Sequence, residues 1–241
     1  MTTLQGQRME RLLAASRLFS GIEPALMSDL AQRATVKHLS RGERLWRVGD
    51  AANQFTLIQA GLVKIMRRAP DGSEAIVALF GPRESVGDVA VIGRRAYPAE
   101  AVVASESADV VRIDAQPILA VMDTRPDVAR RMSCTLVEHT QLLHTKIGVL
   151  SAGAVPKRLA TLLLSLADRF GDELEDGSLS IPVAVSRSEL ACLVSARVET
   201  TIRTIRLWER AGFVSTEDDG FVLHDPAALN RILRAEDTAE A

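Results

Sequence analysis

The apolar pattern of the chain changes its period partway along the sequence, and this change limits what the chain can fold into. From Thr35 to Ile113, short apolar runs alternate with turns that contain Gly, Asp or Pro, among them the hairpin-type pair Asp71-Gly72. Short strands at such spacing are typical of an antiparallel sandwich or barrel. From Pro126 onward, apolar residues recur every three or four positions, which indicates amphipathic helices. The sequence therefore predicts an α+β fold, with a β domain first and helices after it.

The composition is that of a globular protein. Of the 241 residues, 47% are hydrophobic and 25% are charged, so one large domain or two domains of modest size can bury a core. No apolar run approaches the roughly 18 residues of a spanning helix, and the first residues lack the uninterrupted apolar core of a signal peptide. We therefore expect a cytoplasmic protein with no membrane partner.

The two cysteines indicate neither a metal site nor a disulfide. Cys134 and Cys192 lie far apart, and neither has a second Cys or a His at metal-ligand spacing. We interpret both as ordinary thiols and expect no bound metal.

The stretch from Pro126 to Ser151 predicts one long helix. Proline suits the first turn, because its missing N–H would have no partner there, and the helix would be roughly 39 Å long at about 1.5 Å per residue. Its apolar face must be buried, either against the β domain of the same chain or against a second copy. We favour a homodimer interface, formed by Val128, Met132, Leu136, His139, Leu143, Ile147 and Leu150.

The C-terminal part predicts two short helices and a hairpin. Ser186 and Glu189 have the spacing of a capping box, which begins the first helix. Val194-Ser195 is expected to close this first helix, and Ser195 to cap the second helix, which ends at Gly212. Apolar and polar residues then alternate on both sides of Asp219-Gly220, as in a β-hairpin. Two helices joined by a tight turn and followed by a hairpin indicate a winged helix-turn-helix.

The second of these helices carries groups that can recognise bases. Glu199, Arg203 and Arg206 are spaced to share one face, while Ile205 and Trp208 lie on the opposite side and can pack on a core. Arg can donate two hydrogen bonds to guanine, and Glu can accept one from the cytosine amino group. The alternative is an ordinary Glu–Arg ion pair on a solvated helix, which stabilises by only about 0.3–0.5 kcal/mol.

These features together resemble the CRP/FNR family of bacterial transcription regulators. The resemblance covers nearly the whole chain, and the joint order and spacing of its motifs are specific. They are RGE at Arg41–Glu43, GD at Gly49-Asp50, GLVK at Gly61–Lys64, VGD at Val86–Asp88, SRSELA at Ser186–Ala191, and VETTIR at Val198–Arg203 followed by LWERAGFV. The resemblance implies a cyclic-nucleotide-binding-type β jelly roll over residues 1–122, a long dimerisation helix over 123–153 and a winged helix-turn-helix over 154–241.

The resemblance also assigns roles in DNA binding. Glu199 and Arg203 match the main base readers of the family, and Arg187 and Thr200 match positions that contact phosphate. Ile202 departs from the family pattern, in which Ser is usual, so we expect a TTGA-like half-site whose outermost bases are left open. The complete set of expected DNA-binding residues is Ser186, Arg187, Arg197, Val198, Glu199, Thr200, Arg203 and Arg206.

The expected effector pocket lacks the arginine that holds cyclic AMP in family members. Its residues are Gly87, Asp88, Val89, Pro98 and Ala99, with Pro98-Ala99 at the positions where Arg-Ser is expected. Proline offers no side-chain donor to a buried phosphate, so we expect no tight binding of cyclic AMP. Recruiting Arg94 or Arg95 instead would require a shifted register.

The cysteines and histidines of the sequence limit which other cofactors the protein could bind. An iron–sulfur cluster is disfavoured, because two cysteines cannot supply four thiolates. Haem could be held by His38 or His139, although neither lies in a ligand motif. His139 could instead be a protonation switch or a hydrogen-bonded interface residue. The effector, if there is one, stays unidentified.

The sequence thus predicts a homodimeric, sequence-specific DNA-binding regulator rather than an enzyme. His38, His139, His144 and His224 form no catalytic cluster. Double-stranded DNA and a second copy are the expected partners, with RNA polymerase as a third if the protein activates transcription. The rival hypothesis is a ligand-binding regulatory module whose helix-turn-helix docks another protein.

The C-terminal part is acidic as a whole, but its predicted helix-turn-helix is basic. Residues 156–241 contain 10 Lys and Arg against 15 Asp and Glu, yet residues 186–212 contain five Arg against three Glu. With few residues to neutralise phosphates, we expect weak non-specific affinity and a shallow salt dependence. Asp218 and Asp219 should stay clear of the DNA backbone.

Overall fold

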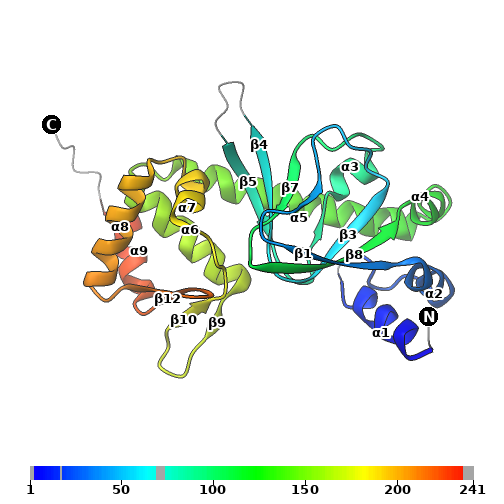
Figure 1. Cartoon of the computed structure of the whole chain (residues 1–241), viewed down its shortest axis with the longest axis horizontal. Helices are drawn as coiled ribbons and strands as arrows, with labels where there is room; N and C mark the ends of the chain where they lie inside the picture. The colour runs from blue at the N-terminus through cyan, green and yellow to red at the C-terminus, as the bar shows by residue number, and fades with distance from the viewer. Residues whose placement is uncertain (1–2, 17, 69–73, 236–241) are drawn as a thin grey trace. The chain divides into compact units, whose positions relative to one another are not determined.

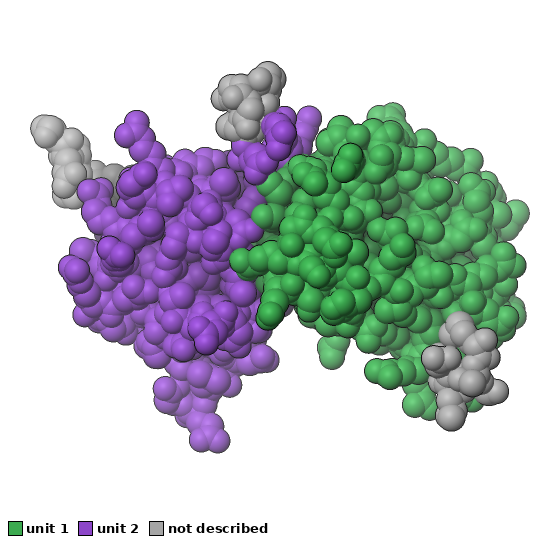
Figure 2. Space-filling model, viewed as in Figure 1, with its two compact units in different colours: residues 1–66, 79–141 green, residues 67–78, 142–241 purple. Residues whose placement is uncertain are grey.

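The computed structural model describes residues 3–16, 18–68 and 74–235, so the predicted turn at Asp71-Gly72 lies outside the described residues. The chain divides into two compact units (Figure 2). The first unit comprises residues 1–66 and 79–141, and the second comprises residues 67–78 and 142–241. No helix in the described ranges is both long enough and apolar enough to cross a membrane.

The β-rich first half of the chain forms two four-stranded sheets (Figure 1). The pairings β1–β8, β8–β3, β3–β6, β2–β7 and β7–β4 are all antiparallel, as the short apolar runs predict. The first sheet has the order β1 (Thr35–Ser40), β8 (Ser107–Asp114), β3 (Gln54–Ala60) and β6 (Ser85–Val86). The second has the order β2 (Arg44–Trp46), β7 (Glu100–Val103), β4 (Val63–Arg68) and β5 (Glu74–Phe80).

Two N-terminal helices, which the sequence analysis did not identify, complete the core of the first unit. They are α1 (Thr3–Ala14) and α2 (Pro24–Arg33). Phe19, from the segment between them, meets Phe55 of β3 edge to face, with ring centroids 6.1 Å apart. The N-terminal segment therefore belongs to the hydrophobic core rather than to a tail.

The other helices of the first half begin at the predicted prolines or at glycine turns. They are α3 (Asp88–Ile92), α4 (Gln116–Met122) and α5 (Pro126–Ser151). Pro117 lies in the first turn of α4. The α5 helix has the predicted bounds, and the division between the two units falls after its residue Gln141.

The apolar face of α5 is divided between two environments. Val128 and Met132 are 3% and 0% exposed and belong to the core of the first unit, so these two residues are occupied within the chain. Leu136 and His139 are half-buried. Leu143, Ile147 and Leu150 are exposed in the single chain.

The second unit is a helical bundle with a small sheet. Its helices are α6 (Val155–Phe170), α7 (Arg187–Val194), α8 (Val198–Arg210) and α9 (Pro226–Arg234). Its sheet has the order β11 (Val214–Glu217), β12 (Gly220–Leu223), β10 (Leu179–Ile181) and β9 (Asp172–Glu173).

Two local predictions in this unit are wrong in detail. Ser195 ends α7, as predicted, in a left-handed conformation with φ of 50°, but it does not cap α8, whose N-cap is Arg197. In the hairpin, Glu217 pairs with Gly220, so the two-residue loop is Asp218-Asp219 rather than Asp219-Gly220. Both errors shift an element by only one or two residues.

Burial of Met132 predicts that its loss destabilises the chain rather than only weakening association. Met132→Ala should lower the free energy of unfolding by about 2–5 kcal/mol, because it leaves a cavity in a closed core. Val137→Ala on the same helix, where the side chain is 59% exposed, should change it by less than about 0.5 kcal/mol. Denaturant unfolding of both variants tests this, and equal effects would contradict it.

Candidate DNA-binding and effector sites

The helix-turn-helix begins with the predicted capping box. The hydroxyl of Ser186 accepts a hydrogen bond from the Glu189 N–H at 3.2 Å, and Glu189 Oε2 accepts one from the Ser186 N–H at 2.7 Å. Two backbone donors that lack intrahelical partners are thereby satisfied. Ser186 thus has a defined structural role at the beginning of α7.

The α8 helix is divided into a buried and an exposed face. Ile205 and Trp208 are 0% and 3% exposed, as predicted, and Thr201 and Thr204 are buried beside them. The opposite face is exposed and slightly hollowed. It is lined by Glu199, Ile202, Arg203, Arg206, Leu207 and Arg210.

The charged side chains of this face are available to bind a partner. Within the described part of the chain, no hydrogen bond or ion pair engages the side chains of Glu199, Arg203 or Arg206. The Glu199–Arg203 ion pair, which was the alternative interpretation of their spacing, does not form. With Arg210 at its C-terminal end, the face therefore presents one carboxylate and three guanidinium groups, which are groups of the kind that can recognise cytosine and guanine edges.

The remaining expected residues lie at the beginning of α8. Arg197 is the exposed N-cap residue, and Val198 is 37% exposed in the first turn. Thr200 is half-buried, and its carbonyl accepts a hydrogen bond from the Thr204 hydroxyl at 2.9 Å. These positions fit the first turn of a helix that enters the major groove with its N-terminal end.

Arg187 is held inside the second unit. Its Nη2 lies 3.0 Å from Glu209 Oε1 and donates to the Thr216 hydroxyl, which itself donates to Glu209 at 2.6 Å. The guanidinium lies over the ring of Phe221, 5.5 Å from its centroid. Burial lowers the pKa of this guanidinium from its usual value. Arg187 therefore links α7, α8 and the wing, and a phosphate contact would require it to use other donor atoms.

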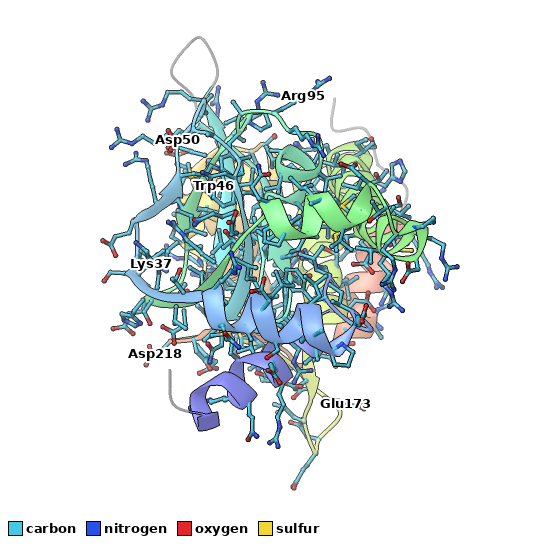
Figure 3. The ribbon with its side chains drawn as sticks, turned by 90° about the vertical axis from the view of Figure 1, so that its right-hand side faces the viewer. Lys37, Trp46, Asp50, Arg95, Glu173 and Asp218 are labelled. Carbon is cyan, nitrogen blue, oxygen red and sulfur yellow. The ribbon has the colours of Figure 1, made fainter. Side chains whose placement is uncertain are left out.

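Two aromatic rings pack against Gly87 in the expected effector pocket. We call its residues, Gly87, Asp88, Val89, Pro98 and Ala99, the effector cassette. Gly87 has φ of 85°, and a Cβ there would lie 2.8 Å from atoms of both Trp46 and Tyr97. These two rings are stacked, with centroids 4.1 Å apart and planes 11° apart. The indole N–H of Trp46, labelled in Figure 3, donates to the Ala99 carbonyl at 3.0 Å.

Asp88 gives the cassette an acidic centre. It is 0% exposed and accepts a hydrogen bond at Oδ2 from the Ser85 hydroxyl, while Oδ1 is buried without a partner. Burial raises the pKa of Asp88 from 3.8 to about 7. His139 Nε2 lies 3.7 Å from Oδ2, and burial lowers the pKa of that imidazole.

The other cassette residues supply no cation. Val89 is 55% exposed, Ala99 is 7% exposed and Pro98 lies on the surface. None of the five cassette residues therefore offers a cation to a phosphate.

Arg94 and Arg95 line a hollow with residues of α4, and no residue of the cassette belongs to its lining. Arg94 pairs with Asp123 at 3.1 Å, and Arg95 is on the surface of the first unit in Figure 3.

The histidines considered as haem ligands have protein partners. His38 Nδ1 lies 2.7 Å from Asp109 Oδ1 on an exposed part of the sheet, and His139 contacts the Phe80 ring with centroids 5.4 Å apart. In the described ranges, no three His, Cys, Asp or Glu residues are grouped as a metal site.

An antiparallel β domain, a long helix and a winged helix-turn-helix with an exposed, charged second helix are together typical of a DNA-binding regulator. The profile of the family "Cyclic nucleotide-binding domain" matches residues 36–125, and that of the "Crp-like helix-turn-helix domain" matches residues 157–232. The chain belongs to the CRP/FNR family of transcription regulators.

Proteins with a similar sequence or a similar structure match most of this chain. The chain is 27% identical to the "CRP-like cAMP-activated global transcriptional regulator" of Mycobacterium tuberculosis, over 94% of this chain and 100% of that protein. It is 23% identical to the "Nitrogen fixation regulation protein FixK" of Bradyrhizobium diazoefficiens, over 92% of each. The FixK2 structure from Bradyrhizobium japonicum matches its fold with a TM-score of 0.70, at 17% identity, over 86% of this chain and 99% of that one. The names of the two sequence relatives are those of regulators.

The buried carboxyl of Asp88 predicts a specific pH dependence of stability. Because its pKa is higher in the folded state, the folded chain binds more protons between about pH 4 and pH 7, and the free energy of unfolding falls as the pH rises through that range. Asp88→Asn removes this loss, so it should be more stable than the wild type at pH 8, by roughly 1–4 kcal/mol, and similar to it at pH 4.

Denaturant unfolding at both pH values measures the difference. Asp219→Asn, at an exposed carboxyl of the hairpin loop, should show no such gain. A variant at Asp88 that is less stable than the wild type at pH 8 would show that the ionised carboxylate has a favourable partner.

Proposed function

We propose that the protein is a homodimeric, sequence-specific transcription regulator that binds an inverted-repeat operator with TTGA-like half-sites. The observation that carries this proposal is the exposed face of α8, on which Glu199, Arg203 and Arg206 have no partner among the described residues. Within this proposal, residues 1–122 are the sensor domain, 123–153 the dimerisation helix and 154–241 the DNA-binding domain.

Recognition follows from the chemistry of this face. Arg203 would donate two hydrogen bonds to the O6 and N7 atoms of guanine, and Glu199 would accept from a cytosine amino group. Ile202, which lines the same hollow, can make apolar contact with a thymine methyl. The net charge of residues 186–212 is only +2, so base contacts rather than phosphate contacts would supply most of the discrimination.

Dimerisation is supported by the exposed residues of α5. Leu143, Ile147 and Leu150 recur at helical spacing and are 40–58% exposed in the single chain. A second copy would bury them as a continuous seam. A two-fold dimer would present two α8 helices to half-sites about one helical turn apart, which requires an inverted repeat. RNA polymerase would be a further partner if the protein activates transcription.

Replacing Arg203 tests the assigned reading face. Arg203→Ala should weaken specific binding by about 1–3 kcal/mol per half-site, because it removes a bidentate contact with a base. Arg234→Ala, on the exposed end of α9, removes the same charge and should leave specific affinity nearly unchanged.

Gel shifts on an operator obtained by selection measure both variants. If Arg203→Ala binds as tightly as the wild type, the reading face is misassigned. In that case the rival function, a helix-turn-helix that docks a protein, becomes the better account.

Cyclic AMP should not be a tight ligand of this protein. An anionic phosphate in the cassette would meet the buried Asp88 carboxyl and, at Pro98, no donor. Isothermal calorimetry should show no binding at micromolar cyclic AMP. Affinity at or below the micromolar range would contradict this expectation and reopen the assignment of the cassette.

A further inference from the structure

Two cations from other helices cover the C-terminal end of α7. The ammonium of Lys146, on α5, donates to the Leu193 carbonyl. The guanidinium of Arg158, on α6, donates to the carbonyls of Val194 and Ser195 at 2.7 and 3.0 Å. All these residues belong to the second unit, in which α6 lies beside α7 (Figure 1). The last carbonyls of a helix have no intrahelical partner and carry partial negative charge, so cations are stabilising there.

These contacts fall on the turn that orients the reading helix. Ser195 has a left-handed φ of 50°, a conformation that non-glycine residues rarely adopt. Arg197, two residues later, is the N-cap of α8. The carbonyls that Lys146 and Arg158 hold, those of Leu193, Val194 and Ser195, thus lie directly before the turn that leads into α8.

We propose that Lys146 and Arg158 are positioning residues for DNA recognition, and that the positive charge of Lys146 holds the turn between α7 and α8 in the conformation that binds DNA. This inference rests on the proposed function. It assigns to the long helix a direct contact with the helix-turn-helix, in addition to its expected role in the dimer.

Burial makes the charged form of Lys146 less favourable in the folded chain than in the unfolded one. Lys146 is half-buried, and burial lowers its pKa from 10.5 to about 8, while negative charge on Cys192 of α7 acts in the opposite direction. Because the unfolded chain binds more protons between about pH 8 and pH 10.5, the free energy of unfolding rises with pH over that range. The charged form is therefore the less favourable one for folding, although it is the stronger cap.

Because the charge of Lys146 is unfavourable for folding but favourable as a cap, its effect on stability can be measured apart from its effect on DNA affinity. Lys146→Met in the full-length protein should keep the melting temperature at pH 7, because it removes the desolvation of a charge. Its specific DNA affinity should nevertheless fall by about tenfold, since each subunit loses one cap. Arg234→Met is the control for loss of one positive charge in the same unit, and it should change neither quantity.

The pH profile supplies the second readout. Wild-type affinity should decline between pH 7 and pH 9 as Lys146 loses its proton. Lys146→Arg, which keeps its charge throughout, should retain the affinity and lose the decline. Cys192 and Arg158 are unchanged in this variant, so a decline that persists would belong to another group.

Different results would overturn different parts of the proposal. Unchanged affinity in Lys146→Met, or a parallel loss of melting temperature and affinity, would overturn the positioning role. A decline with pH that persists in Lys146→Arg would overturn the role of its charge. If the wild type itself fails to bind any selected operator, the proposed function fails first, and this inference fails with it.

Discussion

Burial of one face of α8 is the constraint on which the proposed DNA-binding surface depends. Ile205 and Trp208 are almost completely removed from solvent in the second unit, which fixes the rotation of the helix about its axis. With that rotation fixed, Glu199, Arg203 and Arg206 must point outward together. Trp208 alone contributes a large apolar area to this core. The outward position of the side chains proposed to contact bases thus follows from packing on the other side of the same helix.

The long helix α5 serves the two units in different ways. Its first turns supply Val128 and Met132 to the core of the first unit, and a later turn supplies Lys146 to the end of α7. Between them, His139 lies 3.7 Å from the buried carboxylate of Asp88 in the expected effector cassette. One continuous helix therefore contacts the expected effector cassette through His139 and the end of α7 through Lys146.

Signals that act over a few residues could be predicted from the sequence. The capping box at Ser186, the helix that begins at Pro126 and the two faces of α8 all follow from local spacing, and the structure confirms them. The turn at Ser195 was predicted less well, because a serine can cap the helix before it or the helix after it, and only the tertiary contacts decide between these.

Features that depend on distant residues could not be predicted. Nothing in the local sequence of Arg187 indicates that Glu209 and Thr216 would hold it, since these residues lie on other elements. The packing of α1 and α2 against β3 and α5 has the same origin. Among the site residues, Lys146 and Arg158 were missed because each looks like an ordinary charge on a helix until the end of α7 is placed against it.

Selection of bound sequences from random double-stranded DNA by the purified full-length protein tests the central claim most directly. The account predicts enrichment of an inverted repeat with TTGA-like half-sites whose centres lie one helical turn apart. Enrichment of no sequence, or of a single direct site without two-fold symmetry, would contradict it.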